Sequence, residues 1–207
     1  MAELYGKFLN FLIELLNPLT DHIDKAIFFA VIIAIVMALI PKIDFISDKL
    51  SKFFMVISGI SLIVLTLLVS YDVITRKLFS GGSIALQELE WHLYDIVFLF
   101  GIAYTLSKDK HVRVDIFYDK FPFKLQKGIN LFALVFFVIP LSTLIILEAI
   151  PFVQMSLMQN EGSGDPGGLP DRWIIKSAMI WAFLAVYIQA VGEIRKNFYM
   201  LLKGGEK

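Results

Sequence analysis

Long apolar runs separated by short polar segments set the pattern of this chain. After an amphipathic leader, five such runs stand out, at residues 26–40, 53–74, 84–107, 128–158 and 173–191. A helix needs about 20 predominantly apolar residues to cross a bilayer, and most of these runs reach that length. The pattern therefore predicts an all-α integral membrane protein with about five membrane helices and additional amphipathic interfacial helices.

The leader and the first run are the least regular part of this pattern. The leader, LYGKFLNFLIELLNPL, carries one narrow polar stripe, which is typical of a helix in the membrane interface. Packing against another protein would produce the same stripe. The run 26–40 is short for a span, so a short membrane helix and a re-entrant segment both remain open. The stripe consists of Lys7, Asn10, Glu14 and Asn17.

The last two runs carry features that shape their helices. Pro140 and Pro151 interrupt the fourth run, and prolines of this kind are tolerated in membrane helices but bend them. The fifth run continues as GEIRKNFYMLLK, which is polar enough to predict a helical extension into water.

Composition narrows the functional classes. The chain is 57% hydrophobic, with a mean hydropathy of +0.73, and its 19 basic and 19 acidic residues cancel. No basic patch is interleaved with aromatic residues, so the sequence does not predict nucleic-acid binding. The absence of cysteine from the sequence excludes disulfides, thiolate nucleophiles and thiolate metal ligands.

The distribution of lysine and arginine predicts the orientation in the membrane. Basic residues concentrate in a linker at 41–52, in the loop 108–127 and in the C-terminal tail. These three regions lie on one side if every run from 53 onward spans, and the positive-inside rule makes that side cytoplasmic. Trp91 and Trp173 then mark the outer ends of their helices. If 26–40 spans, the N-terminus is outside.

The stretch QELEWH, at the start of the third run, is the first candidate for chemistry. Glu88, His92 and Asp95 share a helical face, but the outer two are roughly 10 Å apart along the axis, so they do not form a common metal site. No histidine lies in the middle of a run, where a haem ligand would be expected. The sequence therefore predicts no metal and no cofactor.

Polar residues of this stretch nevertheless occupy an arc of roughly 200° around the predicted helix. The uncharged run behind them, residues 96–106, is only roughly 16 Å long, about half the hydrocarbon thickness. Acids at such a depth usually face a protein partner or a wet cavity; the alternative is an interfacial helix whose acids touch water.

The remaining motifs do not indicate an enzyme. GSGDPG, residues 162–167, matches G-x-G-x-x-G, but it lies between two membrane helices rather than after a strand, which favours a tight turn over a nucleotide site. Glu148 lies near the outer end of its run, where interfacial solvation explains it. No Ser/His/Asp arrangement, paired carboxylates with a pocket, or P-loop occurs in the sequence.

One long segment resembles a known family. ALQELEWHLYDIVFLFGIAYTLSKDKHVRVDIFYDKFP is similar to the DctQ-type small membrane subunit of TRAP (tripartite ATP-independent periplasmic) transporters. The shared features are an acidic pair with tryptophan, the step Gly101-Ile102-Ala103, and the loop from His111 to Asp115. GGLPDRWIIK resembles the branch linked with keto acids, mannitol and aromatic carboxylates. The resemblance covers residues 53–195, and residues 1–45 are extra.

The resemblance implies a non-catalytic accessory subunit in the inner membrane of a bacterium. Its partners would be membrane lipid, a large M-type membrane subunit holding the substrate and sodium sites, and a periplasmic binding protein delivering an organic acid. It implies a leader and extra membrane segment (1–45), a four-helix core (46–200) and a cytoplasmic tail (201–207). The residues expected at a partner interface or in structural motifs are Gln87, Glu88, Glu90, Trp91, Asp95, Gly101, His111, Arg113, Asp115, Gly167, Gly168, Pro170, Arg172 and Trp173.

Two other functions are compatible with the residues. An independent small ion transporter would use Glu88, Asp95 and Glu148 as a proton path. A membrane anchor of an oxidoreductase would bind haem. The first predicts flux through the purified chain alone, and the second predicts a coloured preparation.

Overall fold

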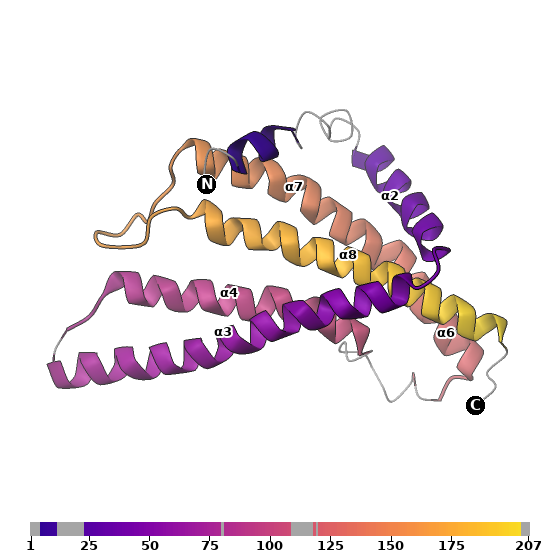
Figure 1. Ribbon diagram of the computed structural model, residues 1–207, viewed down its shortest axis with the longest axis horizontal. Helices are drawn as coiled ribbons and strands as arrows, with labels where there is room; N and C mark the ends of the chain where they lie inside the picture. The colour runs from indigo at the N-terminus through magenta and orange to yellow at the C-terminus, as the bar shows by residue number, and fades with distance from the viewer. Residues whose placement is uncertain (1–4, 12–22, 80, 109–117, 119, 204–207) are drawn as a thin grey trace.

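The computed structural model describes residues 5–11, 23–79, 81–108, 118 and 120–203 (Figure 1). Regular structure in these residues is entirely helical. A short helix covers 5–11, and the remaining elements are α2 (Ile23–Ala38), α3 (Ile43–Phe79), α4 (Ile84–Ser107), α6 (Phe123–Ala133), the π-helix η1 (Leu134–Val138), α7 (Ile139–Met158) and α8 (Trp173–Leu202).

Three described helices are long and apolar enough to cross a membrane: Ile43–Leu78, Phe123–Met158 and Trp173–Leu202. The all-helical membrane class predicted from the sequence is confirmed. α2 has 16 residues, or about 24 Å of helix, which is short of the hydrocarbon thickness. α4 has 24 residues, but acids occupy its first half. The count of five spans therefore stays a prediction.

The boundaries of α3 differ from the expected linker at 41–52. Lys42 has a φ of 66°, and the helix begins directly after it, at Ile43. Asp44 lies in the first turn, where a carboxylate complements the helix dipole. The Ser47 hydroxyl donates to the Asp44 carbonyl at 2.9 Å. The polar residues that suggested a linker form the polar face of a helix that packs on α8.

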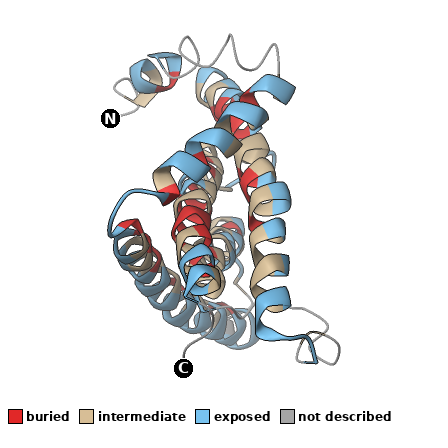
Figure 2. Ribbon diagram, turned by 90° about the vertical axis from the view of Figure 1, so that its right-hand side faces the viewer, coloured by how far each residue is buried: buried red, intermediate tan, exposed pale blue. Residues whose placement is uncertain are grey.

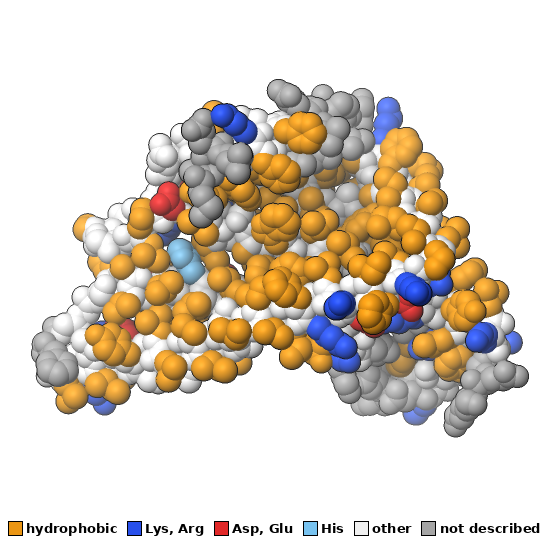
Figure 3. Space-filling model, viewed as in Figure 1, with side chains coloured by type: hydrophobic (Ala, Val, Ile, Leu, Met, Phe, Trp, Pro, Cys, Tyr) orange, Lys and Arg blue, Asp and Glu red, His pale blue; other side chains and the backbone are white. Residues whose placement is uncertain are grey.

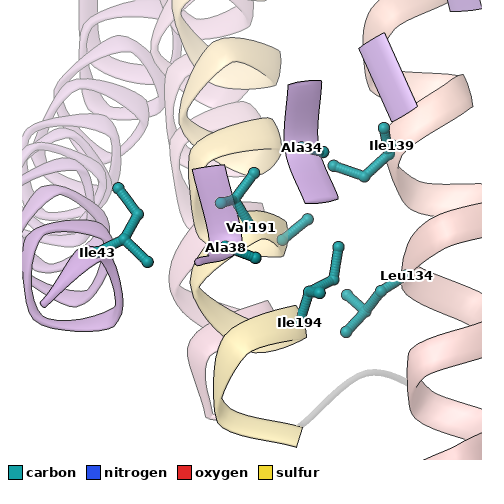
Figure 4. Packing of buried hydrophobic residues seen from close by; sticks show 8 residues of the cluster. Ala34, Ala38, Ile43, Leu134, Ile139, Val191 and Ile194 are labelled. Atoms are coloured by element: carbon teal, nitrogen blue, oxygen red, sulfur yellow. The ribbon is translucent and has the colours of Figure 1, made fainter. Parts of the chain in front are cut away.

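α8 is the centre of the bundle. The α3–α4 hairpin packs on one side of it, and α7 with α2 packs on the other (Figures 1 and 2). The main apolar cluster joins α2, the start of α3, η1 and the start of α7 to α8 (Figure 4). Its buried residues are Ala34, Ala38, Ile43, Leu134, Ile139, Ala190, Val191 and Ile194.

Small residues allow α8 to approach its neighbours closely. A Cβ added to Gly192 would lie 2.9 Å from Ser47 Cβ and 3.3 Å from Asp44 Cα, so only glycine fits this crossing with α3. Close contact between small residues is the usual basis of helix packing in membranes. Gly192 thus fixes where α3 crosses α8.

The segment Phe123–Met158 accommodates its first proline with a change of helix type. η1 ends two residues before Pro140, which lacks an N–H and whose ring would clash with the carbonyl four residues earlier in a regular α-helix. The wider π-turn relieves that conflict. Pro151 lies inside α7.

The N-terminal part packs on α7 and α8. α2 is one unbroken helix, which disfavours a re-entrant loop; the Tyr187 hydroxyl donates to the Ala30 carbonyl at 2.8 Å. In the leader, Leu9 is 1% exposed and Gln154 Nε2 donates to Asn10 Oδ1 at 2.6 Å. The leader's polar stripe therefore packs partly against its own chain; Glu14 and Asn17 lie outside the described residues.

The exterior is apolar along most of its length. Figure 3 shows hydrophobic side chains over the visible face, with lysine and arginine gathered where α3 begins and α8 ends. We name this the basic end; it holds Lys42, Lys49, Lys52, Arg195, Lys196 and Lys203. The opposite end, which we name the loop end, holds the connection 159–172 between α7 and α8 and the start of α4.

Candidate functional site

The start of α4 positions the QELEWH stretch. Ser83 is its N-cap: the Leu86 N–H donates to Ser83 Oγ at 3.4 Å and the Gln87 N–H donates to the Ser83 carbonyl at 3.2 Å. A serine cap of this kind fixes the first turn of a helix. The acids that follow therefore emerge on defined faces of α4.

Glu88 points into the protein and binds the α7–α8 loop. It is 8% exposed. Its Oε1 accepts hydrogen bonds from the Ser163 hydroxyl and from Arg172 Nη2, the latter at 3.1 Å. Its Oε2 accepts from the Leu169 N–H at 2.6 Å. A buried carboxylate is tolerable because it is paired and hydrogen-bonded in this way. Glu88 thus ties α4 to a loop 75 to 84 positions later in the chain.

The loop is shaped to enclose this carboxylate. The Ser163 N–H donates to the Leu169 carbonyl at 2.9 Å. Gly167 has a φ of +84°, a region that favours glycine. A Cβ on Gly168 would lie 2.7 Å from Glu88 Oε2 and closer still to the Ser163 side chain. The G-x-G-x-x-G match is therefore a loop between two helices, with no strand in the described residues before it.

A second ion pair closes the base of the same loop. Lys176 Nζ donates to Glu161 Oε2, and the Arg172 N–H donates to the Glu161 carbonyl at 2.9 Å. The Lys176 hydrogen bond holds the pKa of the Glu161 carboxyl below its usual range. Lys176 Nζ also lies 4.1 Å from the centroid of the Phe152 ring. The loop is therefore fixed to both α7 and α8.

The other acids of the stretch, Glu90 and Asp95, lie away from the α7–α8 loop. Glu90, Trp91 and Asp95 line a groove of about 530 Å³ between α3 and α4, together with Leu65, Val69 and Tyr94. Glu90 Oε1 is buried without a hydrogen-bond partner among the described residues. Trp91 is 70% exposed. α4 thus carries one internal acid and a separate lateral acidic groove.

The remaining predicted residues are spread over the fold. Gly101 lies against α3, where a Cβ would be 3.6 Å from Ser58 Oγ. Trp173 packs on Tyr5, with ring centroids 5.1 Å apart. Gln87 is half-buried and Pro170 is exposed at the loop end. His111, Arg113 and Asp115 lie outside the described residues.

A polar cluster that the sequence did not predict joins α3 to α8 at the basic end. Lys196 Nζ lies 2.7 Å from Asp48 Oδ1 and 2.8 Å from Glu193 Oε1. Gln189 Nε2 donates to Asp48 Oδ1 at 2.9 Å, and Arg195 Nε lies 3.6 Å from an Asp44 carboxylate oxygen. The signal in the sequence was the spacing of Gln189, Glu193 and Lys196, which places all three on one face of a helix. In the fold, Gln189 and Lys196 from this face both bind Asp48.

Across the residues that the structure describes, no three His, Cys, Asp or Glu side chains are grouped to hold a metal ion. Glu88 and Asp95 share a face of α4 but lie roughly 10 Å apart along its axis, and they have different surroundings. Glu88 binds the α7–α8 loop, and Asp95 lines the groove against α3. The polar groups of the site therefore hold segments of the chain together or face sideways from the bundle.

These features define the class of protein: a helical membrane subunit with ionic ties between its helices. The comparison with protein families identifies it further, since the DctQ component of tripartite ATP-independent periplasmic transporters matches residues 65–199. The chain belongs to this family and is the small membrane subunit of a TRAP transporter, as its resemblance predicted. Searches of curated proteins and of solved structures give no match.

The family match covers only part of the described helices. It begins within α3, so residues 5–11 and α2 lie outside it. TRAP systems of this family combine the small subunit with a large membrane subunit and a periplasmic binding protein.

Proposed function

We propose that this chain is the non-catalytic scaffold subunit of a sodium-coupled importer of an organic acid. In this proposal the large membrane subunit holds the substrate and sodium sites, and a periplasmic binding protein delivers the acid. The chain lies in the bacterial inner membrane, with its C-terminus and the loop 108–127 in the cytoplasm. Its residues contribute a fixed framework rather than a binding site.

The observation that carries this proposal is the pair of ionic ties at the two ends of the bundle. Glu88 joins α4 to the α7–α8 loop at the loop end, and Lys196 joins α8 to Asp48 of α3 at the basic end. A protein that alternates between two conformations needs elements free to move against each other. Ties at both ends instead favour a body of constant shape, as a scaffold requires.

The proton-path alternative is weakened by the placement of its acids. Glu88 binds Arg172 and the loop, Asp95 lines the lateral groove, and Glu148 is exposed on α7, across α8 from that groove. A proton relay needs its groups within hydrogen-bond reach, directly or through water. Glu88 and Asp95 lie roughly 10 Å apart along α4, and Glu148 lies on a different helix.

Co-purification and uptake test the proposal together. The tagged chain should recover a much larger polytopic protein in about equal amount, and sodium-dependent uptake in cells should require both. Purification of the chain alone, with uptake surviving its deletion, would contradict the scaffold role. Proton flux through the chain alone in liposomes would support the independent transporter, and a haem absorption band would support the oxidoreductase anchor. The ligand of the co-purifying binding protein identifies the acid.

A further inference from the structure

The two sides of the bundle differ in how far the chain itself covers them. On the side of α7, residues 5–11 and α2 pack over the helices, and Val153 of α7 and Ala190 and Val191 of α8 are 0% exposed. On the side of α3 and α4 no described segment lies over the hairpin (Figures 1 and 2).

The uncovered side also carries polar groups without partners. In the groove between α3 and α4, Glu90 Oε1 is buried and unpaired. Asp95 makes no hydrogen bond or salt bridge with any described residue, and its one electrostatic neighbour in the fold is His92, on its own helix. The rest of the groove is apolar or aromatic: Leu65, Val69, Trp91 and Tyr94. Carboxylates at membrane depth are costly unless a protein group or water satisfies them. Lipid tails offer neither a cation nor a hydrogen-bond donor.

We propose that the α3–α4 face, centred on the groove around Glu90 and Asp95, receives a transmembrane helix of the large membrane subunit. That helix carries a cation or hydrogen-bond donor level with Asp95. The inference rests on the proposed function and adds to it the surface and the chemistry of the contact. Charge complementarity selects this occupant, because an apolar helix would leave both acids unsatisfied. On the other side, α2 and residues 5–11 already pack on part of α7 and α8.

Neutral substitutions test the chemistry of the contact. Asp95→Asn and Glu90→Gln keep the shape of each side chain and remove its charge. Hydrogen bonds between membrane helices contribute about 0.6 kcal/mol on average and up to about 1.7. At about tenfold per 1.4 kcal/mol, each variant should therefore lower recovery of the large subunit by about three- to 16-fold. Glu148→Gln is the matched control, because it is an exposed acid on α7. Loss with Glu148→Gln and not with Asp95→Asn would overturn the proposal.

Photo-crosslinking in membranes that contain the whole transporter tests the location. Tyr94 on α4 and Phe137 on η1 are 61% and 63% exposed, and each is replaced by a photoreactive phenylalanine analogue. A crosslink to the large subunit from position 94 alone supports the proposal. A crosslink from 137, or from neither position, overturns the assignment of the face and leaves the scaffold function standing. Failure of the unmodified chain to co-purify with a large subunit overturns both.

Discussion

Gly168→Ala is the sharpest test of how Glu88 and the α7–α8 loop fit together. The new Cβ would lie 2.7 Å from Glu88 Oε2 and nearer still to the Ser163 side chain, where ordinary contacts are 3.4–4 Å. Ser163 and Glu88 must therefore move apart, which breaks the hydrogen bond between them. Overpacking of this kind costs typically 1–3 kcal/mol. The open form of the loop should become about five- to 150-fold more populated, at about tenfold per 1.4 kcal/mol.

Trypsin cleavage after Arg172 measures that population, because Arg172 pairs with Glu88 in the closed loop. When the loop reopens and closes faster than it is cut, the cleavage rate follows the open fraction. The Arg172–Trp173 cut is quantified by mass spectrometry against the cut after Lys203, which lies at the other end of α8. Gly168→Ala should raise the ratio of cleavage after Arg172 to cleavage after Lys203 by about five- to 150-fold.

Gly164→Ala supplies the matched control. It is in the same loop, but no heavy atom lies within 4 Å of its added Cβ and its φ is not in the left-handed region. Its cleavage ratio should stay at the wild-type value. An unchanged ratio in Gly168→Ala would refute the packing argument, and an equal rise in both variants would show that any substitution loosens the loop.

Three further outcomes follow from the same ties. Glu88→Lys should reduce recovery of the large subunit in co-purification more than it weakens substrate binding by the isolated receptor, measured by calorimetry. A larger effect on substrate binding than on recovery would show that Glu88 does not act in assembly. Lys196→Met removes the cation that joins α8 to α3 and should lower the apparent melting temperature in detergent, by about 2–4 °C for each kcal/mol lost. Because the pKa of Glu161 is lowered in the fold, its contribution is present above the ordinary value of 4.5 and is lost as the pH falls through the lower folded value. Trp173 fluorescence, with the other two tryptophans replaced by phenylalanine, should report loop opening in that acid range, and Glu161→Gln should abolish this pH dependence.

The helix pattern and the family were predictable from the sequence because both are encoded locally. The third apolar run, 84–107, coincides with α4, since Ser83 caps the helix and the polar segment 108–127 follows it. The DctQ resemblance rested on contiguous motifs, and the family match confirms it. The segment 41–52 was misjudged because its polar residues alternate with apolar ones at helical spacing, and α8 supplies their partners.

The role of Glu88 could not be predicted in the same way. The sequence allowed two interpretations of Glu88, contact with a protein partner or with interfacial water. In the fold, Glu88 binds a loop of its own chain. Arg172 was predicted as an interface residue through a different motif, GGLPDRWIIK. The spacing of two motifs in the sequence does not indicate how close they lie in space. Sequence reasoning found the residues on both sides of this contact but not the contact. The partner roles of Glu90, Trp91 and Asp95 stay predictions.

The π-turn at Leu134–Val138 has a consequence for the rotational phase of its helix. A π-turn inserts one residue relative to an α-helix, which rotates everything beyond it by about 100° about the axis. A helical wheel drawn through the whole of 123–158 therefore assigns the wrong face to one of its halves. Deleting one residue within η1 should remove this extra rotation and turn α6 away from its contacts with α8, while Pro140 keeps its conflict with the preceding turn. The two halves of this helix are thus set in phase separately, although both pack on α8.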